Sequence, residues 1–129
     1  MTSFILKCAA AASLIVASIS AGSALAATGT GVYAATVGSS GTMIRNTRAT
    51  SSSKSSTGRY SVVFPDVISQ CSWSATVGGT GTVAPSPAFA VAHRSSASTS
   101  TIEVRVWAVN NQAVHVQADA PFHLIVVCD

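Results

Sequence analysis

Three histidines, His93, His115 and His123, are the first side chains of this sequence to consider for chemistry. Zinc is held by imidazole nitrogens that converge from several segments, and a catalytic site keeps one position open for water. His115 and His123 lie on short segments that can pair as neighbouring strands, but no H-x-H or H-E-x-x-H spacing supports a shared ligand set. We therefore predict no metal site and no cofactor, with His115 directed to solvent and His123 on the outward face of its strand.

The serines and carboxylates of the chain form no hydrolytic motif. No serine stands in a G-x-S-x-G elbow. Asp66, Glu103 and Asp119 are the carboxylates available for a glycosidase pair, and nothing in their spacing selects two of them. The glycine-rich stretches lack the lysine of a phosphate-binding loop and are interpreted as turns. This pattern predicts a protein that is not an enzyme.

Residues 1–26 have the composition of a secretory signal peptide. Lys7 precedes a stretch of Ala, Leu, Ile and Val, and Ala24-Leu25-Ala26 is the small-x-small pattern that a signal peptidase cleaves. Serines interrupt the apolar stretch, whereas a membrane-spanning helix needs roughly 18 or more apolar residues in a row. An uncleaved membrane anchor is the alternative. We expect cleavage after Ala26 and one exported domain over residues 27–129, secreted, extracellular or periplasmic, and not held in the membrane.

Two cysteines, Cys71 and Cys128, follow the expected leader, and Cys8 lies within it. Disulfides persist in exported proteins, and two cysteines allow one intramolecular pairing. In the chain-entropy model a bridge that closes the loop from residue 71 to residue 128 stabilises a domain by roughly 4 kcal/mol. A reactive thiol, the alternative, needs an electropositive and partly exposed setting that the sequence does not indicate. We predict a structural bridge between Cys71 and Cys128.

The charge of the chain argues against one class of partner. One of the seven lysines and arginines, Lys7, lies in the leader, so six cationic residues remain against four acidic ones, a balance of +2. These charges are few and scattered, and they do not form the basic stripe that nucleic-acid-binding proteins carry. We therefore predict no nucleic-acid partner.

Short runs of Val, Ile, Thr and aromatic residues, separated by Gly, Ser, Pro and Asn, predict an all-β domain. We expect strands over residues 32–37, 42–46, 59–64, 71–77, 88–93, 101–109, 113–117 and 122–128. Residues 47–58 are Ser/Thr-rich and form either a loop or a polar edge strand. About seven or eight short strands at this spacing are typical of a sandwich or a small barrel. We predict a single antiparallel β-sandwich with one disulfide.

Alternation along the expected strands assigns side chains to an inner and an outer face. In residues 71–77, Cys71 and Trp73 share the core face, and Cys71 can therefore meet a second inward cysteine. The core face of the last strand consists of Phe122, Leu124, Val126 and Cys128. The two sulfur atoms are thus expected to meet inside the sandwich.

The outward set of the last strand is His123, Ile125 and Val127. This set is more apolar than a solvent-facing strand needs. Apolar patches on exported proteins often mark assembly surfaces. We therefore expect this face to be covered, either by other parts of the chain or by a partner, which would be a second copy or another surface protein.

Trp107 shares a face of residues 101–109 with Glu103 and Arg105. An exposed tryptophan on a sheet can stack on a sugar ring, because its face is apolar while its edge stays hydrated. This predicts a glycan contact at Trp107 with Arg105 or Glu103. The alternative is that Trp107 packs at an interface or under a loop.

Three stretches, "TGRYSVVFPDVISQCSWSATVG" (57–78), "IEVRVWAV" (102–109) and "DAPFHLIVVC" (119–128), carry a family resemblance. Together they resemble an uncharacterised group of small exported bacterial proteins and repeat units with the pattern G-x-Y-x-V-x-F, C-x-x-x-A-T-x-G and P-F-H-L-x-V-x-C. The similarity covers about the last 70 residues. It implies an extracellular β-sandwich with a bridge between Cys71 and Cys128, and it implies no reaction. No collagen-like segment, which precedes some members of the group, is present here.

The sequence therefore predicts an exported, non-enzymatic surface module for assembly or adhesion. The alternative function is a carbohydrate-binding module that uses Trp107 as its stacking platform.

Overall fold

The computed structural model describes residues 30–81 and 87–129, and within these ranges nine strands form two antiparallel sheets. The strands are β1 (Gly31–Val37), β2 (Met43–Thr47), β3 (Ser51–Ser56), β4 (Arg59–Val63), β5 (Ser72–Val77), β6 (Ala88–Arg94), β7 (Thr101–Val109), β8 (His115–Gln117) and β9 (Phe122–Cys128). The predicted all-β sandwich is confirmed. The expected signal peptide and residues 82–86, which precede β6, lie outside the described residues. No helix among the described residues is long and apolar enough to cross a membrane.

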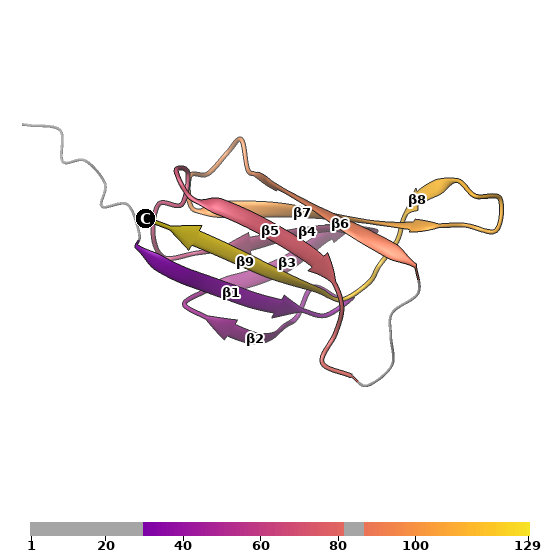
Figure 1. Cartoon of the computed structure of the whole chain (residues 1–129), viewed down its shortest axis with the longest axis horizontal. Coiled ribbons are helices and arrows are strands. Elements are labelled where there is room, and N and C mark those ends of the chain that lie inside the picture. Colours follow the sequence, from indigo (N-terminus) through magenta and orange to yellow (C-terminus); the bar gives the residue numbers. More distant parts are fainter. Residues whose placement is uncertain (1–29, 82–86) are drawn as a thin grey trace, which may run out of the picture.

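The two sheets face each other as the two layers of a sandwich (Figure 1). One sheet has the order β2-β1-β9-β5, with the last strand β9 paired to β1 on one side and to β5 on the other. The second sheet has the order β3-β4-β7-β6. Along one side of β7, β4 pairs with the first residues of β7 and the short strand β8 pairs with its last residues.

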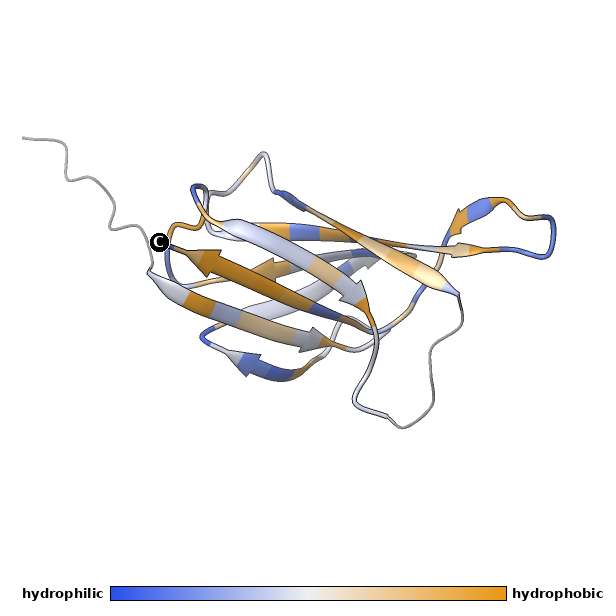
Figure 2. Cartoon of the chain, in the orientation of Figure 1, coloured by the Kyte–Doolittle hydropathy of each residue, from blue (hydrophilic) through white to orange (hydrophobic). Residues whose placement is uncertain are grey.

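The core is formed by the inward residues of both sheets. Aromatic contacts join the layers, since Tyr33 of β1 lies against Phe64 at 5.7 Å between ring centroids and Tyr60 of β4 lies against Phe122 of β9 at 5.1 Å. Figure 2 shows β9 as hydrophobic along most of its length, because its outward side chains are also apolar. Burial of each large side chain stabilises the fold by roughly 1.5–3 kcal/mol.

The predicted bridge between Cys71 and Cys128 is confirmed, with a sequence separation of 57 and a Cα–Cα distance of 4.4 Å. Cys71 directly precedes β5 and Cys128 ends β9, so the bridge fastens two neighbouring strands of one sheet. Trp73 faces inward but is only partly buried. Its Nε1 donates a hydrogen bond to the Ala92 carbonyl at 3.3 Å, which connects β5 to β6 of the other sheet.

The Ser/Thr-rich segment forms an edge strand, β3, over Ser51–Ser56, which was one of the two sequence-based alternatives. A turn at Gly58 connects it to β4. Gly58 has a φ of 66°, and a Cβ at this position would lie 2.6 Å from the Val106 carbonyl oxygen. The Val106 N–H donates to the Gly58 carbonyl at 2.8 Å. This close approach fixes β4 in register against β7.

The turn between β7 and β8 is longer than the sequence predicted, because β8 begins at His115 rather than at residue 113. The Asn110 side-chain oxygen accepts hydrogen bonds from the N–H groups of Gln112 and Val114, each at 3.0 Å. Ala113 adopts a φ of 60° in this turn. The turn therefore uses two residues that alternation assigned to the strand, and the hairpin projects beyond the sandwich (Figure 1).

Candidate functional site

The outer faces of the two sheets carry different sets of exposed and partly exposed side chains. The aromatic face, on the outside of the β3-β4-β7-β6 sheet and β8, includes Phe89, Trp107, His115, Arg59, Arg105 and Gln117, and the exposed Val91 and Val109 lie on the same side. The valine face, on the outside of the other sheet, consists of Val32, Ile125 and Val127. Both sets point away from the core because they alternate with its buried residues.

Trp107 lies in the middle of the aromatic face. Its cross-strand neighbours are Phe89 on β6 and Gln117 on β8. The Phe89 ring is 42% exposed and meets the His115 ring edge-to-face, with 5.3 Å between centroids. Trp107 is partly exposed. Three rings from three strands thus lie on the outside of one sheet, with Phe89 and His115 in contact and Trp107 opposite Phe89.

The cationic part of the aromatic face lies next to Trp107. Arg105 precedes Trp107 by two residues on β7 and is directly opposite Arg59 on β4. Arg59 Nε donates a hydrogen bond to Gln117 Oε1 at 3.4 Å, which connects the cationic part to the aromatic part. Like charges directly opposite each other in a sheet are destabilising, so the charges of this pair do not stabilise the sheet.

A hollow of about 210 Å³ lies beside these arginines. Its lining residues are Ser55, Arg59, Tyr60, Ser61, Glu103, Val104 and Arg105. Glu103 forms its acidic end and lies opposite His93, with 3.7 Å between Glu103 Oε2 and His93 Nε2. The hollow therefore offers both cationic donors and a carboxylate acceptor on the same face as Trp107, with Arg105 two residues and Glu103 four residues before it on β7.

The residues predicted for a glycan contact were Trp107, Arg105 and Glu103, and the structure places all three on the outer face of β7. The other predicted interface residues, His123, Ile125 and Val127, lie on the outer face of β9. Sequence reasoning missed the four residues that complete the aromatic face, Arg59, Phe89, His115 and Gln117. They come from β4, β6 and β8. The signal that would find them is the pairing of these strands with β7, which alternation along single strands does not contain.

The expectation that His115 and His123 lie on neighbouring strands is wrong. His115 is on β8 in one sheet, and His123 is on β9 in the other. His123 Nδ1 shares a hydrogen bond with Thr36 Oγ1 at 3.0 Å, and His115 is exposed and contacts Phe89. In the part of the chain that the structure describes, no three His, Cys, Asp or Glu side chains come together as metal ligands.

Asp119 holds a polar junction between the sheets. Its carboxylate accepts hydrogen bonds from Lys54 Nζ at 2.5 Å and from the Gly58 N–H at 2.8 Å. These bonds, Lys54 first, hold the pKa of Asp119 below its ordinary value. Tyr60 Oη lies 3.2 Å from Asp119 Oδ1 and 3.0 Å from the Ser39 carbonyl. Burial, followed by the charge of Asp119, raises the pKa of Tyr60 to about 12.

Asp66 has a comparable structural role at the opposite end of β1. It accepts a hydrogen bond from Tyr33 Oη at 2.7 Å and lies 3.4 Å from Arg48 Nη2. The hydrogen bond to Asp66 raises the pKa of Tyr33. Arg48 also lies over the Tyr33 ring, 4.4 Å from its centroid. Asp66, Glu103 and Asp119 thus have separate partners and do not form an acid–base pair with one another.

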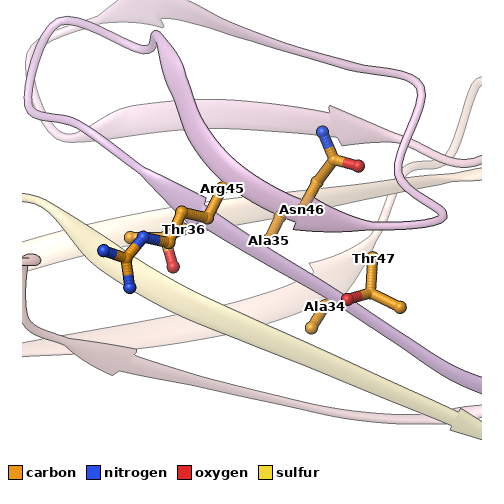
Figure 3. Close-up of a pocket in the computed structure, with 6 residues that line it drawn as sticks. All are labelled: Ala34, Ala35, Thr36, Arg45, Asn46 and Thr47. Atoms are coloured by element: carbon orange, nitrogen blue, oxygen red, sulfur yellow. The ribbon is translucent and has the colours of Figure 1, made fainter.

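A larger hollow, of about 450 Å³, lies between β1 and β2. Its lining residues are Ala34, Ala35, Thr36, Arg45, Asn46 and Thr47. Figure 3 shows Arg45 lying across Thr36 and Asn46 pointing the other way. No aromatic ring is among its lining residues, which are small or polar side chains together with Arg45. The aromatic face, which combines rings with charged and amide groups, is the stronger candidate for a ligand site.

Comparisons with known proteins leave the site to be interpreted from its own chemistry. No family model matches the sequence, and no curated protein and no solved structure gives a match. The resemblance to the group of exported bacterial proteins stays a prediction.

Proposed function

We propose that this chain is an exported, non-enzymatic adhesion module that binds carbohydrate through its aromatic face. The observation that carries the proposal is the alignment of Trp107, Phe89 and His115 on the outside of one sheet, with Gln117 and Arg105 beside them. Sugar rings present apolar faces and polar edges, so they fit a surface of exposed rings with hydrogen-bonding groups around it. Because the rings are on paired strands, they are held in place before a ligand arrives.

Two further features support an adhesion module outside the cell. The Cys71–Cys128 bridge is of the kind that persists in oxidising compartments, in agreement with the leader expected at residues 1–26. The carboxylates Asp66 and Asp119 are engaged in structural hydrogen bonds, which favours binding over acid–base catalysis.

The first test is glycan binding by the Trp107→Ala variant. We expect a loss of at least tenfold in affinity on a glycan array, followed by titration calorimetry, because the variant removes the central ring of the face. Trp73→Phe is the matched control, since Trp73 lies on the inner side of the other sheet; its glycan affinity should equal that of the unmodified chain. Full binding by Trp107→Ala, or no glycan bound by the unmodified chain, would contradict the proposal.

A second candidate function is assembly through the valine face. Val32, Ile125 and Val127 are 54%, 49% and 44% exposed, and Val32 is directly opposite Val127 on the neighbouring strand. Serines of β5 flank them, with Ser72 opposite Val127 and Ser74 opposite Ile125. Val32, Ile125 and Val127 carry no charge, so the same three residues of a second copy can cover them without burying a charge among them. Arg45 of β2, opposite Thr36, lies on the same side of the sheet.

A further inference from the structure

We propose that the ligand of the aromatic face is an acidic saccharide, whose carboxylate is bound by Arg59 and Arg105 while a sugar ring stacks on Trp107. This inference rests on the carbohydrate binding proposed above and names the class of sugar. It follows from the position and the bonding of the two arginines.

The two guanidinium groups have few partners within the protein. Arg105 makes no hydrogen bond and no ion pair with any of the residues that the structure describes, and Arg59 has the single bond to Gln117 at 3.4 Å. The nearby carboxylate of Glu103 is directed to His93, at 3.7 Å. Donors of both arginines therefore stay available. A guanidinium group binds a carboxylate through two parallel hydrogen bonds, which are stronger than bonds between neutral groups.

The electrostatics of the pair favours an anion. Arg59 and Arg105 are direct cross-strand neighbours, and like charges in this position repel. Folding alone gives no reason to keep both. A carboxylate in the hollow between them would neutralise the repulsion, so the positive charge that costs stability in the free protein would contribute to affinity in the complex.

The spacing along β7 suits one sugar unit and its acidic substituent. Residues two apart on one face of a strand are separated by about 7 Å. A ring stacked on Trp107 therefore brings its substituents over Arg105 and the hollow of about 210 Å³. Glu103 and Ser61 line the far side of that hollow and can accept hydrogen bonds from sugar hydroxyls.

An acidic peptide would also meet the charge requirement, but the rings favour a saccharide. Trp107 and Phe89 are direct neighbours on adjacent strands, and the Phe89 ring is exposed. Such a surface stacks on the apolar face of a pyranose, whereas a string of carboxylates alone would leave it unused.

The experiment measures binding of the full chain to polygalacturonate, to the same polymer after reduction of its carboxyl groups, and to poly-glutamate, by titration calorimetry at low salt. We expect binding to polygalacturonate and at least tenfold weaker binding to the other two. Arg59→Gln and Arg105→Gln should each weaken polygalacturonate binding at least tenfold, and added NaCl should weaken it further by screening. Arg45→Gln, which removes the same charge from the opposite outer face, should change nothing.

Folding of these variants is checked by thermal unfolding. The Tm of Arg105→Gln should equal or slightly exceed that of the unmodified chain, because a repulsion is removed. A lost affinity with an unchanged Tm therefore reports on the ligand.

Four results would overturn the inference. In the first, the unmodified chain binds the reduced polymer as tightly as polygalacturonate, Trp107→Ala loses this binding and Arg105→Gln keeps it. Carbohydrate binding would then stand, and only the specificity for acidic saccharides would be removed. Poly-glutamate binding as tight as polygalacturonate binding would indicate a site for acidic peptides. Loss of binding in Arg45→Gln to the same degree as in Arg105→Gln would indicate general attraction to polyanions. Failure to bind any saccharide would overturn the proposed function as well.

Discussion

The inner faces of the two sheets are alike, and their outer faces are not. Inside, both sheets present buried tyrosine and aliphatic side chains, such as Tyr33 and Leu124 on one sheet and Tyr60 and Val104 on the other. Outside, one sheet carries the valine face and the other the aromatic face. Inner residues are constrained by packing in the core, whereas exposed residues contribute little to stability. The difference between the outer faces is therefore not set by packing in the core.

The two outer faces suit partners of different kinds. The valine face is flanked by the serines of β5. Two of its three residues belong to β9, which is hydrophobic along most of its length (Figure 2). The aromatic face has rings, two arginines and Gln117, and thus both stacking surfaces and directed donors. Exposed apolar side chains without charge favour association with the same residues of a second copy. A surface of rings and guanidinium groups favours a polar ligand with ring faces.

The largest expected effect comes from the bridge that fastens only the sheet with the valine face. Changing Cys71 and Cys128 together to serine removes the link between β5 and β9, so we expect the free energy of unfolding to fall by roughly 2–5 kcal/mol. Urea denaturation followed by tryptophan fluorescence measures this loss. At temperatures where the variant stays folded, the aromatic face on the other sheet should keep its glycan affinity. Two titratable thiols in denatured protein that consists of residues 27–129 and therefore lacks Cys8 would refute the bridge.

Neighbouring residues of β9 provide the next test, because they face opposite sides of one sheet. Leu124 is fully buried, and Leu124→Ala should lower the free energy of unfolding by about 2–5 kcal/mol. The pair of changes Ile125→Arg and Val127→Arg lies on the valine face and should alter stability by less than about 0.5 kcal/mol. The same pair should abolish self-association in size-exclusion chromatography with light scattering.

A strict monomer in the unmodified chain, with unchanged solubility in the Ile125→Arg and Val127→Arg variant, would remove the second candidate function. The comparison of the faces would then depend on the aromatic face alone.

The sequence predicted best what depends on neighbours along the chain. Residues 101–109 and 122–128 are β7 and β9 with the predicted bounds, because their period-2 alternation of buried and exposed side chains is regular. The start of β8 was predicted two residues early, since the side chain of Asn110 holds the backbone of the turn. The alternation of apolar and polar residues does not predict hydrogen bonds of this kind, from a side chain to the backbone of a turn.

The sequence predicted least what depends on the pairing of strands. Trp107 and Arg105 were recognised as outward, but Arg59 precedes them by more than 40 residues, and its place beside Arg105 follows from the β4–β7 register. The same limit explains the misplaced pair His115 and His123, which are close along the chain and on opposite sheets. Alternation along one strand therefore identifies only the site residues on that strand. The site residues on neighbouring strands can be assigned only when the sheet topology is known.

The smallest effect concerns Asp119, which lies between β8 and β9 where the chain passes from one sheet to the other. Asp119→Asn keeps an oxygen for the Gly58 N–H but loses the charge opposite Lys54, so we expect a loss of about 1 kcal/mol at neutral pH. The pKa of Asp119 is lower in the folded chain than in the unfolded one. Its contribution is therefore present above the unfolded pKa and is lost as the pH falls through the folded pKa. Urea titrations should show the difference between the two proteins at pH 7 and its disappearance below the folded pKa.

The phenol of Tyr60 gives a second measurement of the same junction. Its pKa of about 12 is raised first by burial and then by the charge of Asp119. In Asp119→Asn the second cause is gone, so the pKa of Tyr60 should fall toward its ordinary value of 10.0 without reaching it. Ultraviolet titration of tyrosine ionisation measures this shift. Because a raised pKa stabilises the fold until the pH passes the unfolded value, the unmodified chain should lose stability between pH 10 and about 12, and Asp119→Asn should lose less. An unchanged tyrosine titration would mean that the charge of Asp119 does not contribute to the raised pKa of Tyr60, and burial between the two sheets would then account for it.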